Sequence, residues 1–532
     1  MEGALSQTLS GVVTNQAMVN PDRVCVVDVA RTWSYGETAS AIEKQTAALL
    51  AAGVNPGDRV GVHLKKSAEG FIAMHAALSA GAVAVPLDPG SPAARLARIC
   101  DDMGISVVSS HNPLKQSLAA LHELSPLRGV VGADVVLDGA QVVSSDDVAM
   151  MTSAPPATVA ENDPSYIVTT SGSTGEPKGI VHTHSSGRAF ADMAIGAFGI
   201  DENDRVSDIS PHHFDISALS LWSSPLVGAT NIVVNEAYQS LPASHSQLLA
   251  DQAVTIWYSV PFLLQQLLLR GDLANRDLGA LRWVVFAGEV VPAEIIGEMM
   301  SHCSNARFAN GFGPAETNVV SLAVFDMAPN PDLALPIGHP VDQTLLRIID
   351  PSADTPIIEN EVPTGEIGEM WSATPQLMTG YWNRDDVNDR VLKSVDGHRF
   401  YRSGDLASVD SDGQLAFHGR VDNQIKVRGY RIELEGIEVE LETLVKRMAV
   451  AENVVVSVLR QPSGEDEIVA GILGATSDFD PFEFQRSAAS VVPSYAVPVH
   501  TVQINASAFT GSGKLDRGSL RRQAVALTEE KS

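Results

Sequence analysis

Glycines, hydroxyl residues and one lysine gather in the segment that starts at Tyr166, YIVTTSGSTGEPKG, whose first residues form an apolar run. Glycines let backbone N–H groups approach an anion, hydroxyls donate to phosphate oxygens, and a lysine adds a compact positive charge. This order of residue types predicts a strand that ends in a polyphosphate clamp. The clamp residues are Thr170, Ser171, Gly172, Ser173, Thr174 and Lys178.

Spacing excludes two other loops that look similar. A P-loop requires G-x-x-x-x-G-K-[ST], which this segment lacks. A hydrolase nucleophile elbow begins with Gly, where this chain has Ser171, and no Ser/His/Asp order elsewhere supports a hydrolase. The plainest alternative to a phosphate site is a flexible Ser/Gly loop.

Five strings in a fixed order resemble motifs of the acyl-adenylate-forming superfamily, which includes acyl-CoA synthetases, luciferases and the adenylation domains of nonribosomal peptide synthesis. They are TTSGSTGEPKG, NGFGPAETN from Asn310, YRSGDL from Tyr401, GRVDNQIKVRG from Gly419 and GSGKLDR from Gly511. The resemblance implies an enzyme, a ligase that uses ATP and Mg2+ to activate a carboxylate as an acyl-AMP. It also implies an α/β fold with a large multi-layered N-terminal adenylate-forming domain, residues 1–420, and a small mobile α+β C-terminal domain, residues 421–532.

The same resemblance implies the catalytic roles. Lys514 would bridge the substrate carboxylate and the α-phosphate as the main catalytic residue, assisted by Thr170 and Lys178. Glu316 would hold Mg2+ on the phosphates, because a carboxylate is a hard oxygen ligand. The hinge between the two domains would fall at Asp422.

The nucleotide contacts follow from the same motifs. Asn310 would meet the adenine amino group, Phe312 would stack on the base, and Asp405 would accept both ribose hydroxyls. Arg420 would contact the ribose or a phosphate. The remaining nucleotide positions are Gly288, Glu289, Gly311 and Thr317.

One position departs from the family pattern. The superfamily usually has Thr where Ala315 stands, and that hydroxyl binds phosphate. We expect Thr317 or the hydroxyls of the earlier loop to compensate.

The string Phe214-Asp215-Ile216-Ser217 resembles the F-D-x-S motif of peptide-synthetase adenylation domains, in which the Asp binds the substrate ammonium. An Asp in an apolar pocket is an uncompensated charge unless an amino group pairs with it. The alternative is that Asp215 is only the N-cap of the following helix. The substrate-binding positions placed by the family pattern are Phe214, Asp215, Ile216, Leu219, Tyr258, Val285, Ala287, Gly311, Val319, Val320 and Lys514.

None of the lining positions other than Asp215 and Lys514 is charged, and Leu219 and Tyr258 occupy volume. A small neutral amino acid such as alanine, 2-aminobutyrate, proline or valine is therefore the expected substrate. Pockets separate substrates that differ by one methylene by only ~1 to 3 kcal/mol, so the choice among these stays open. If Tyr258 points elsewhere, Gly311 leaves room for something larger, including a β-amino acid.

The acyl acceptor is expected to be the phosphopantetheine thiol of a separate acyl or peptidyl carrier protein, in natural-product biosynthesis. Only 18 residues follow Lys514, which is too few for a carrier domain, so a free-standing enzyme is expected. Two other functions are the alternatives. An acyl-CoA ligase would not need Asp215, and a nucleotide-binding regulatory or scaffold protein would not need Lys514, Glu316 and Asp405.

The elements that position these motifs have an α/β texture. Short apolar runs predict strands, and they alternate with stretches of helical spacing over the first ~420 residues. A helical pattern from Ile437 to Leu444 marks the C-terminal domain. The expected strands are Val24–Val27, Val60–Leu64, Ala82–Pro86, Tyr166–Thr170 and Trp283–Ala287, and the expected helices include Ala41–Ala52 and Phe71–Ser79.

Composition excludes several classes of partner. The 532-residue chain has a formal net charge of −28, which disfavours nucleic acid. No apolar run approaches the ~20 residues of a membrane span, and the N-terminus does not resemble a secretory signal, so a cytoplasmic protein without a membrane partner is expected. Cys25, Cys100 and Cys303 lie too far apart for a zinc or disulfide pattern and are expected to be buried thiols.

Overall fold

The computed structural model describes residues 8–170, 176–461, 466–504 and 516–530. The chain forms two compact units. The first comprises Met1–Pro89, Cys100–Thr169 and Gly179–Val421, and the second comprises Gly90–Ile99, Thr170–Lys178 and Asp422–Ser532. Each unit is described by itself below.

An eight-stranded sheet in the first unit carries the strand that precedes the predicted phosphate loop. Its order is β19-β9-β8-β4-β3-β5-β6-β7, and the strands from β4 to β7 are parallel. The bounds are β3 (Arg59–Val62), β4 (Val83–Pro86), β5 (Val107–Ser109), β6 (Gly129–Val131), β7 (Gln141–Val143), β8 (Pro164–Thr170), β9 (Lys178–Thr183) and β19 (Gly380–Tyr381).

A nine-stranded sheet carries most of the predicted substrate residues. Its order is β16-β15-β14-β13-β12-β10-β11-β1-β2, with a parallel centre and antiparallel edges. The bounds are β1 (Val24–Val27), β2 (Thr32–Ser34), β10 (Arg205–Asp208), β11 (Thr230–Val233), β12 (Ile256–Ser259), β13 (Trp283–Ala287), β14 (Arg307–Phe312), β15 (Ser321–Phe325) and β16 (His339–Pro340).

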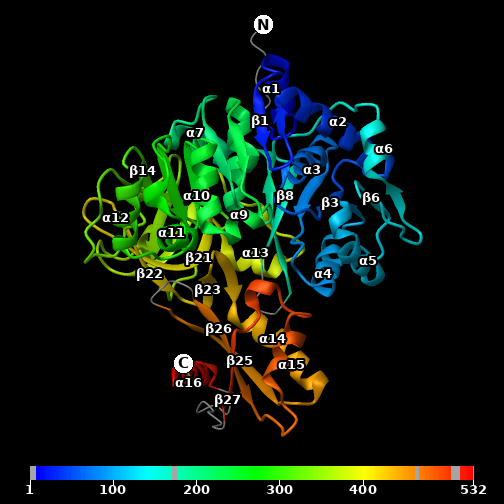
Figure 1. Cartoon of the computed structure of the whole chain (residues 1–532). Helices are drawn as coiled ribbons and strands as arrows, with labels where there is room; N and C mark the ends of the chain where they lie inside the picture. The colour runs from blue at the N-terminus through cyan, green and yellow to red at the C-terminus, as the bar shows by residue number, and fades with distance from the viewer. Residues whose placement is uncertain (1–7, 171–175, 462–465, 505–515, 531–532) are drawn as a thin grey trace. The chain divides into compact units, whose positions relative to one another are not determined.

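Alternate residues of β13 face two different apolar cores, as the two-residue period of a strand requires. Val284 and Phe286 pack with α10 (Pro242–Asp251), α11 (Pro261–Arg270) and α12 (Ala293–His302), which lie together in the green part of Figure 1. Val285 and Ala287 belong to the main core, to which α1 (Val12–Val19), α2 (Tyr35–Ala51), α3 (Ala68–Ser79) and α7 (His184–Phe198) contribute. The site residues thus lie on the core-facing side of the sheet.

The first unit is completed by a smaller antiparallel sheet and short helices. The sheet order is β17-β18-β21-β20, and β22 pairs with β21. Its strands are β17 (Leu345–Ile349), β18 (Gly368–Ala373), β20 (Leu392–Val395), β21 (His398–Val409) and β22 (Leu415–Arg420). The other helices and turns are α4 (Ala93–Met103), which runs on from the second unit, η1 (Asn112–Leu114), α5 (Lys115–Leu124), α6 (Ser145–Met150), η2 (Asp215–Ser217), η3 (Leu219–Ser223), α8 (Ser224–Val227), α9 (Glu236–Ser240), η4 (Leu273–Asn275), η5 (Ile358–Asn360) and α13 (Asp385–Val391).

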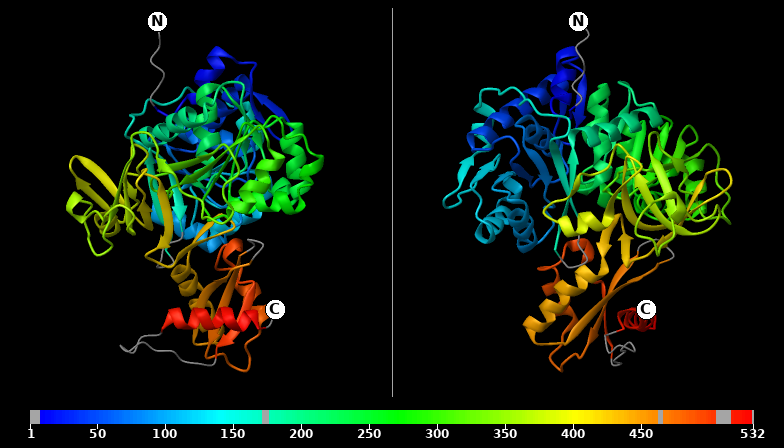
Figure 2. Two further views of the ribbon diagram at one scale, coloured as in Figure 1. Left: turned by 90° about the vertical axis from the view of Figure 1, so that its left-hand side faces the viewer. Right: turned by 180° about the vertical axis from the view of Figure 1, so that it is seen from behind.

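The second unit is a small α+β structure. A hairpin, β23 (Gln424–Val427) and β24 (Tyr430–Glu433), precedes a sheet of β25 (Asn453–Leu459), β26 (Glu467–Leu473) and β27 (His500–Ile504). One face of this sheet packs on α14 (Leu434–Met448), α15 (Pro481–Ala488) and the turn η6 (Ser494–Ala496), and the other face packs on α16 (Arg517–Glu529). Figure 2 shows α16, in red, against these strands.

The α/β texture predicted from the sequence is confirmed, and the boundaries show what the apolar pattern missed. Helix α2 begins at Tyr35 because Ser34 and Glu37 form a capping box, and α3 begins at Ala68 because Ser67 caps it. Cys25, Cys100 and Cys303 are free and buried, as expected. In the described part of the chain, no helix has the length and apolar character that a membrane crossing needs.

Candidate active site

Three neighbouring parallel strands bring together four of the predicted substrate residues. Tyr258 on β12 lies opposite Val285 on β13, and Ala287 on β13 lies opposite Gly311 on β14. A Cβ atom added at Gly311 would lie 3.7 Å from the Cβ of Ala287 and 3.7 Å from a methyl of Val319. A methyl group at position 311 would therefore meet its neighbours at an ordinary van der Waals distance.

Two further predicted residues belong to or pack against the main core, and a third belongs to a separate cluster. Leu219 is buried in the same core as Tyr258, and Ile216 is a partly buried residue packed against that core. Val320 is instead buried in a separate cluster with Ile337 and Met370. Val319 belongs to the main core, so these two consecutive residues pack in different apolar clusters.

Asp215 begins the short turn η2, where its Oδ1 accepts a hydrogen bond of 3.0 Å from the backbone N–H of Ile216. Burial raises the pKa of Tyr258 and of Tyr166, and the charge of Asp215 raises both further. The carboxylate therefore lies near two buried phenols. Phe214, not Asp215, holds the N-cap position of η2, so the N-cap alternative does not describe this turn.

The carboxylate of Glu316 is fully buried and accepts a 2.5 Å hydrogen bond from the hydroxyl of Tyr381. The hydroxyl of Tyr401 lies 3.1 Å from that of Tyr381. The backbone carbonyl of Glu316 accepts from Met378 N–H at 2.8 Å. Glu316 is thus fixed at both its side chain and its backbone.

The turn that carries Glu316 is held by its neighbours. His182 Nε2 donates to the carbonyl oxygen of Ala315 at 2.9 Å, and burial lowers the pKa of His182 to about 4, so the ring is neutral near pH 7. A Cβ at Gly313 would lie 1.7 Å from the carbonyl oxygen of Asn318, so only glycine fits there. The Thr317 hydroxyl is buried and lies 3.3 Å from the carbonyl of Pro314, which makes that carbonyl its acceptor.

Asp405 and Arg420 form a cross-strand ion pair. They are register partners on β21 and β22, and Arg420 Nη1 lies 2.5 Å from Asp405 Oδ1. Asp405 is only 6% exposed, and its N–H donates to Ser403 Oγ at 3.0 Å. The two predicted ribose contacts are therefore adjacent, and one oxygen of Asp405 already meets the guanidinium.

The remaining predicted nucleotide residues lie in the last half of β14 or directly after β13. Asn310 Nδ2 donates to the carbonyl of Pro336 at 2.9 Å, which orients the carboxamide. The rings of Phe312 and Phe417 have centroids 5.6 Å apart. Two more of these residues follow β13: Gly288 has a φ of 101°, which suits glycine, and Glu289 Oε2 lies 3.4 Å from the N–H of Phe262.

Five predicted residues, Ser171, Gly172, Ser173, Thr174 and Lys514, lie outside the described residues. Thr170 ends β8, Lys178 begins β9, and Asp422 begins the last segment of the second unit. Among the described residues, no group of three or more His, Cys, Asp or Glu side chains is arranged to hold a metal. A single carboxylate such as Glu316 nevertheless fits Mg2+, which is usually held by one or two carboxylates together with substrate phosphates.

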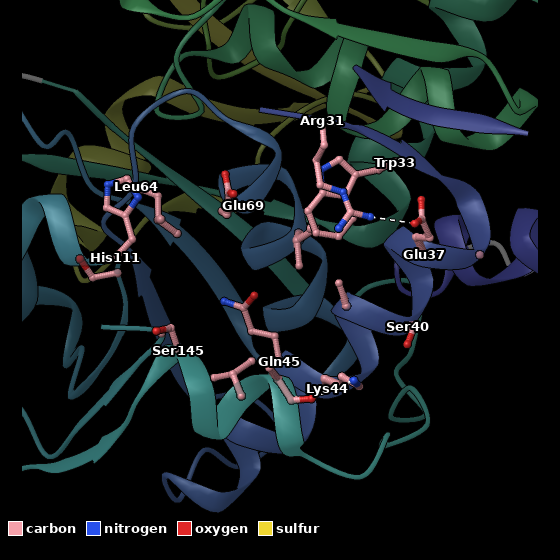
Figure 3. A pocket seen from close by; sticks show the side chains of 17 residues that line it. Arg31, Trp33, Glu37, Ser40, Lys44, Gln45, Leu64, Glu69, His111 and Ser145 are labelled. Carbon is pink, nitrogen blue, oxygen red and sulfur yellow. Dashed lines mark hydrogen bonds and ion pairs between the residues drawn. The ribbon is translucent and has the colours of Figure 1, made fainter. Parts of the chain in front are cut away.

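The first unit also contains a cavity of about 700 Å3 that the sequence did not indicate. The cavity lies beside the ends of the neighbouring strands β3 and β5. Leu64, which follows β3, and Ser110 and His111, which follow β5, line it. Figure 3 shows Arg31 beside Trp33 and Glu37 at another part of the wall. None of the predicted site residues lines this cavity.

Comparison with known proteins decides the family. The sequence model described as "AMP-binding enzyme" matches residues 13–382. The chain belongs to the AMP-binding enzyme family. The predicted superfamily membership is thereby confirmed, and this AMP-binding enzyme has the adenylate-forming fold that the motifs implied.

Individual relatives of this AMP-binding enzyme differ in length. Tyrocidine synthase 1 of Brevibacillus parabrevis is 29% identical over 97% of this chain, which spans only 45% of that synthase. An L-proline–[L-prolyl-carrier protein] ligase of Pseudomonas fluorescens is 31% identical over 94% of this chain and 96% of the ligase. The Vibrio cholerae adenylation domain AlmE, solved with glycyl-adenosine-5'-phosphate, shares the fold with a TM-score of 0.83, 21% identity and 99% coverage of both chains.

Proposed function

We propose that this AMP-binding enzyme activates a small neutral amino acid as an aminoacyl-AMP and passes the acyl group to the phosphopantetheine thiol of a separate carrier protein. In the first half-reaction, a carboxylate oxygen attacks the α-phosphorus of ATP and pyrophosphate leaves. In the second, the thiol loses its proton and attacks the carbonyl carbon, and AMP leaves. The similarity to a ligase named for proline and its carrier protein supports both steps.

The observation that carries the amino acid assignment is the charge of Asp215. Its carboxylate lies near the buried phenols of Tyr166 and Tyr258, next to the apolar wall formed by the three parallel strands. An amino acid would present its ammonium group to this carboxylate, an attraction between opposite charges that is strong beside buried apolar surface. A fatty or aryl acid has no ammonium group to make this contact.

The wall residues support a small side chain. Ala287 and Gly311 are small register partners on β13 and β14, whereas Tyr258 and Leu219, in the same core as Ala287, are bulky. Alanine, 2-aminobutyrate, proline and valine match this combination, and a β-amino acid would need additional depth beyond Gly311.

The charged residues have separate tasks in the first half-reaction. We assign to Lys514 the neutralisation of the substrate carboxylate and the α-phosphate, and to Thr170 and Lys178 the contacts with the phosphates. Asp405 would accept the ribose hydroxyls beside Arg420. Mg2+, when bound, would neutralise phosphate charge, and Glu316 would hold it with an oxygen oriented by Tyr381.

The test is exchange of labelled pyrophosphate into ATP, driven in turn by each proteinogenic amino acid, by 2-aminobutyrate and by several β-amino acids. We expect exchange with one small neutral amino acid and its loss in Lys514→Ala. Exchange with a β-amino acid would revise the substrate class. Exchange with plain carboxylic acids alone would refute the proposal and identify an acyl ligase.

A further inference from the structure

A buried ion pair in the first unit involves none of the predicted site residues. Lys66 Nζ pairs with Asp208 Oδ1, and each side chain is only 1% exposed. Lys66 follows β3 in the eight-stranded sheet, and Asp208 is the last residue of β10 in the nine-stranded sheet. Buried charges are costly unless they are well paired, so this pair fixes the end of β10 to the segment before α3.

The same carboxylate oxygen also closes a loop. The hydroxyl of Ser220 donates to Asp208 Oδ1, so one atom joins the two ends of the segment from Asp208 to Ser220. Within the segment, Phe214 N–H donates to Pro211 at 3.0 Å, and Ser217 N–H donates to Phe214 at 3.1 Å. Asp215 lies within the second of these turns, near the middle of the closed loop.

The loop is seated against α3 as well. The imidazole of His212 approaches Gly70 so closely that a Cβ there would lie 2.5 Å from Cε1. Neither ring nitrogen of His212 has a hydrogen-bond partner in the part of the chain that the structure describes. Burial lowers the pKa of His212, and the charge of Lys66 lowers it further, so the lysine also keeps this ring neutral.

We infer that Lys66 is a positioning residue for substrate recognition: through Asp208 and Ser220 it fixes the loop that carries Asp215. The inference rests on the proposed function, because it assigns Asp215 to the substrate ammonium. The Lys66 side chain is only 1% exposed, so its role is assigned through Asp208 and not through the substrate. Lys66 is therefore expected to affect the binding of the amino acid and not the binding of ATP.

The experiment measures the KM values for the amino acid and for ATP in pyrophosphate exchange, with the full-length enzyme and its variants. Lys66→Met is expected to raise the KM for the amino acid at least tenfold and to change the KM for ATP less than twofold. In an Asp215→Ala background, the same substitution should change the amino acid KM less than twofold, because the residue through which Lys66 acts is gone. The matched control is Lys65→Met, whose ion pair with Glu236 is exposed; it should leave both KM values unchanged.

Ser220→Ala keeps the ion pair and removes only the hydroxyl that closes the loop. We expect a three- to tenfold rise in the amino acid KM with a thermal midpoint near that of the parent, so the inference stays testable if Lys66→Met fails to fold. Equal rises in the KM for the amino acid and the KM for ATP would show a merely structural role of Lys66 and overturn the inference. Additive effects of Lys66→Met and Asp215→Ala on the amino acid KM would overturn it as well.

Failure of the proposed function has a different signature. If the parent exchanges only with plain carboxylic acids, the assignment of Asp215 to an ammonium fails. A rise confined to the KM for the acid in Ser220→Ala would still support positioning by the closed loop, and an unchanged KM would overturn it.

Discussion

The hydroxyl of Tyr381 lies 2.5 Å from a carboxylate oxygen of Glu316, a side chain that is fully buried. The phenol is the donor in this bond, because an ionised carboxylate can only accept. Glu316 is proposed to hold Mg2+, so Tyr381 would set the orientation of the metal ligand.

Tyr381→Phe removes that donor and keeps the ring. A hydrogen bond to a charged group contributes ~1.5 to 3 kcal/mol, so we expect the Mg2+ concentration for half-maximal pyrophosphate exchange to rise about tenfold. Tyr238→Phe, in a residue outside the site, is the control. An unchanged Mg2+ dependence in Tyr381→Phe would contradict the assignment of Glu316.

Gly311→Ala should narrow the substrate pocket without unfolding the enzyme. The new methyl would lie 3.7 Å from Ala287 and Val319, an ordinary contact distance. Because one methylene is worth ~1 to 3 kcal/mol in such a pocket, kcat/KM for the larger accepted amino acids should fall about 10- to 200-fold relative to alanine. A uniform loss for all amino acids would argue that Gly311 does not face the side chain.

Gly338→Ala is the matched control for that substitution. Gly338 has a φ of 82°, and a Cβ there would lie 2.0 Å from the backbone oxygen of Leu322. We therefore expect a lower thermal midpoint for Gly338→Ala and an unchanged one for Gly311→Ala.

The second unit has its own buried carboxylate. Glu438 is 1% exposed and accepts from Arg517 Nε at 2.8 Å, from Arg521 Nε at 2.9 Å and from the N–H of Val456 at 2.9 Å. Breaking a buried pair costs ~3 to 5 kcal/mol. Glu438→Gln should therefore accelerate hydrogen–deuterium exchange throughout α16.

Glu467→Gln provides the comparison. Glu467 pairs with His500 at 2.7 Å with both side chains partly exposed, and such pairs are worth ~0 to 1 kcal/mol. The rate of hydrogen–deuterium exchange in α16 of Glu467→Gln should therefore be close to that of the parent. Equal acceleration in both variants would show that the Glu438 network does not anchor α16.

Acid should destabilise the enzyme through buried histidines. Burial lowers the pKa of His245 from 6.5 to about 4. Between these values the unfolded chain binds a proton that the folded chain does not, so the free energy of unfolding falls as pH falls from 6.5 to 4. His245→Leu should make this dependence shallower, by up to ~1.4 kcal/mol per pH unit, in urea unfolding at pH 6.5, 5.5 and 4.5.

His398→Gln, in an exposed residue, serves as the control for that series. It should leave the pH dependence of unfolding as it is in the parent. A His245→Leu curve parallel to that of the parent would show that His245 is not the group that titrates.

The sequence predicted correctly those strands that consist of an uninterrupted run of apolar residues. The strands Val24–Val27 and Trp283–Ala287 match β1 and β13 residue for residue, because continuous apolar runs leave little ambiguity. The starts of α2 and α3 were missed because hydrogen bonds of Ser34 and Ser67 set them, and the apolar pattern does not record those bonds.

The sequence named candidate residues for the site, but it did not predict the contacts that those residues make. Motif strings identified Asp405 and Arg420 separately, but their ion pair arises from the register of β21 with β22. Val319 packs in the main core and Val320 packs in a separate cluster, and the motif pattern does not distinguish these two neighbouring positions. The Lys66–Asp208 pair joins residues 142 positions apart, a contact that only the packing of the two sheets creates.

The most direct measurement compares pyrophosphate exchange driven by an amino acid and by its des-amino analogue, such as alanine and propionate, in the parent and in Asp215→Ala. Amino acid activation through Asp215 predicts strong exchange with the amino acid, little with the analogue, and a loss of this preference in Asp215→Ala. Equal exchange with both acids in the parent, unaffected by the substitution, would contradict it.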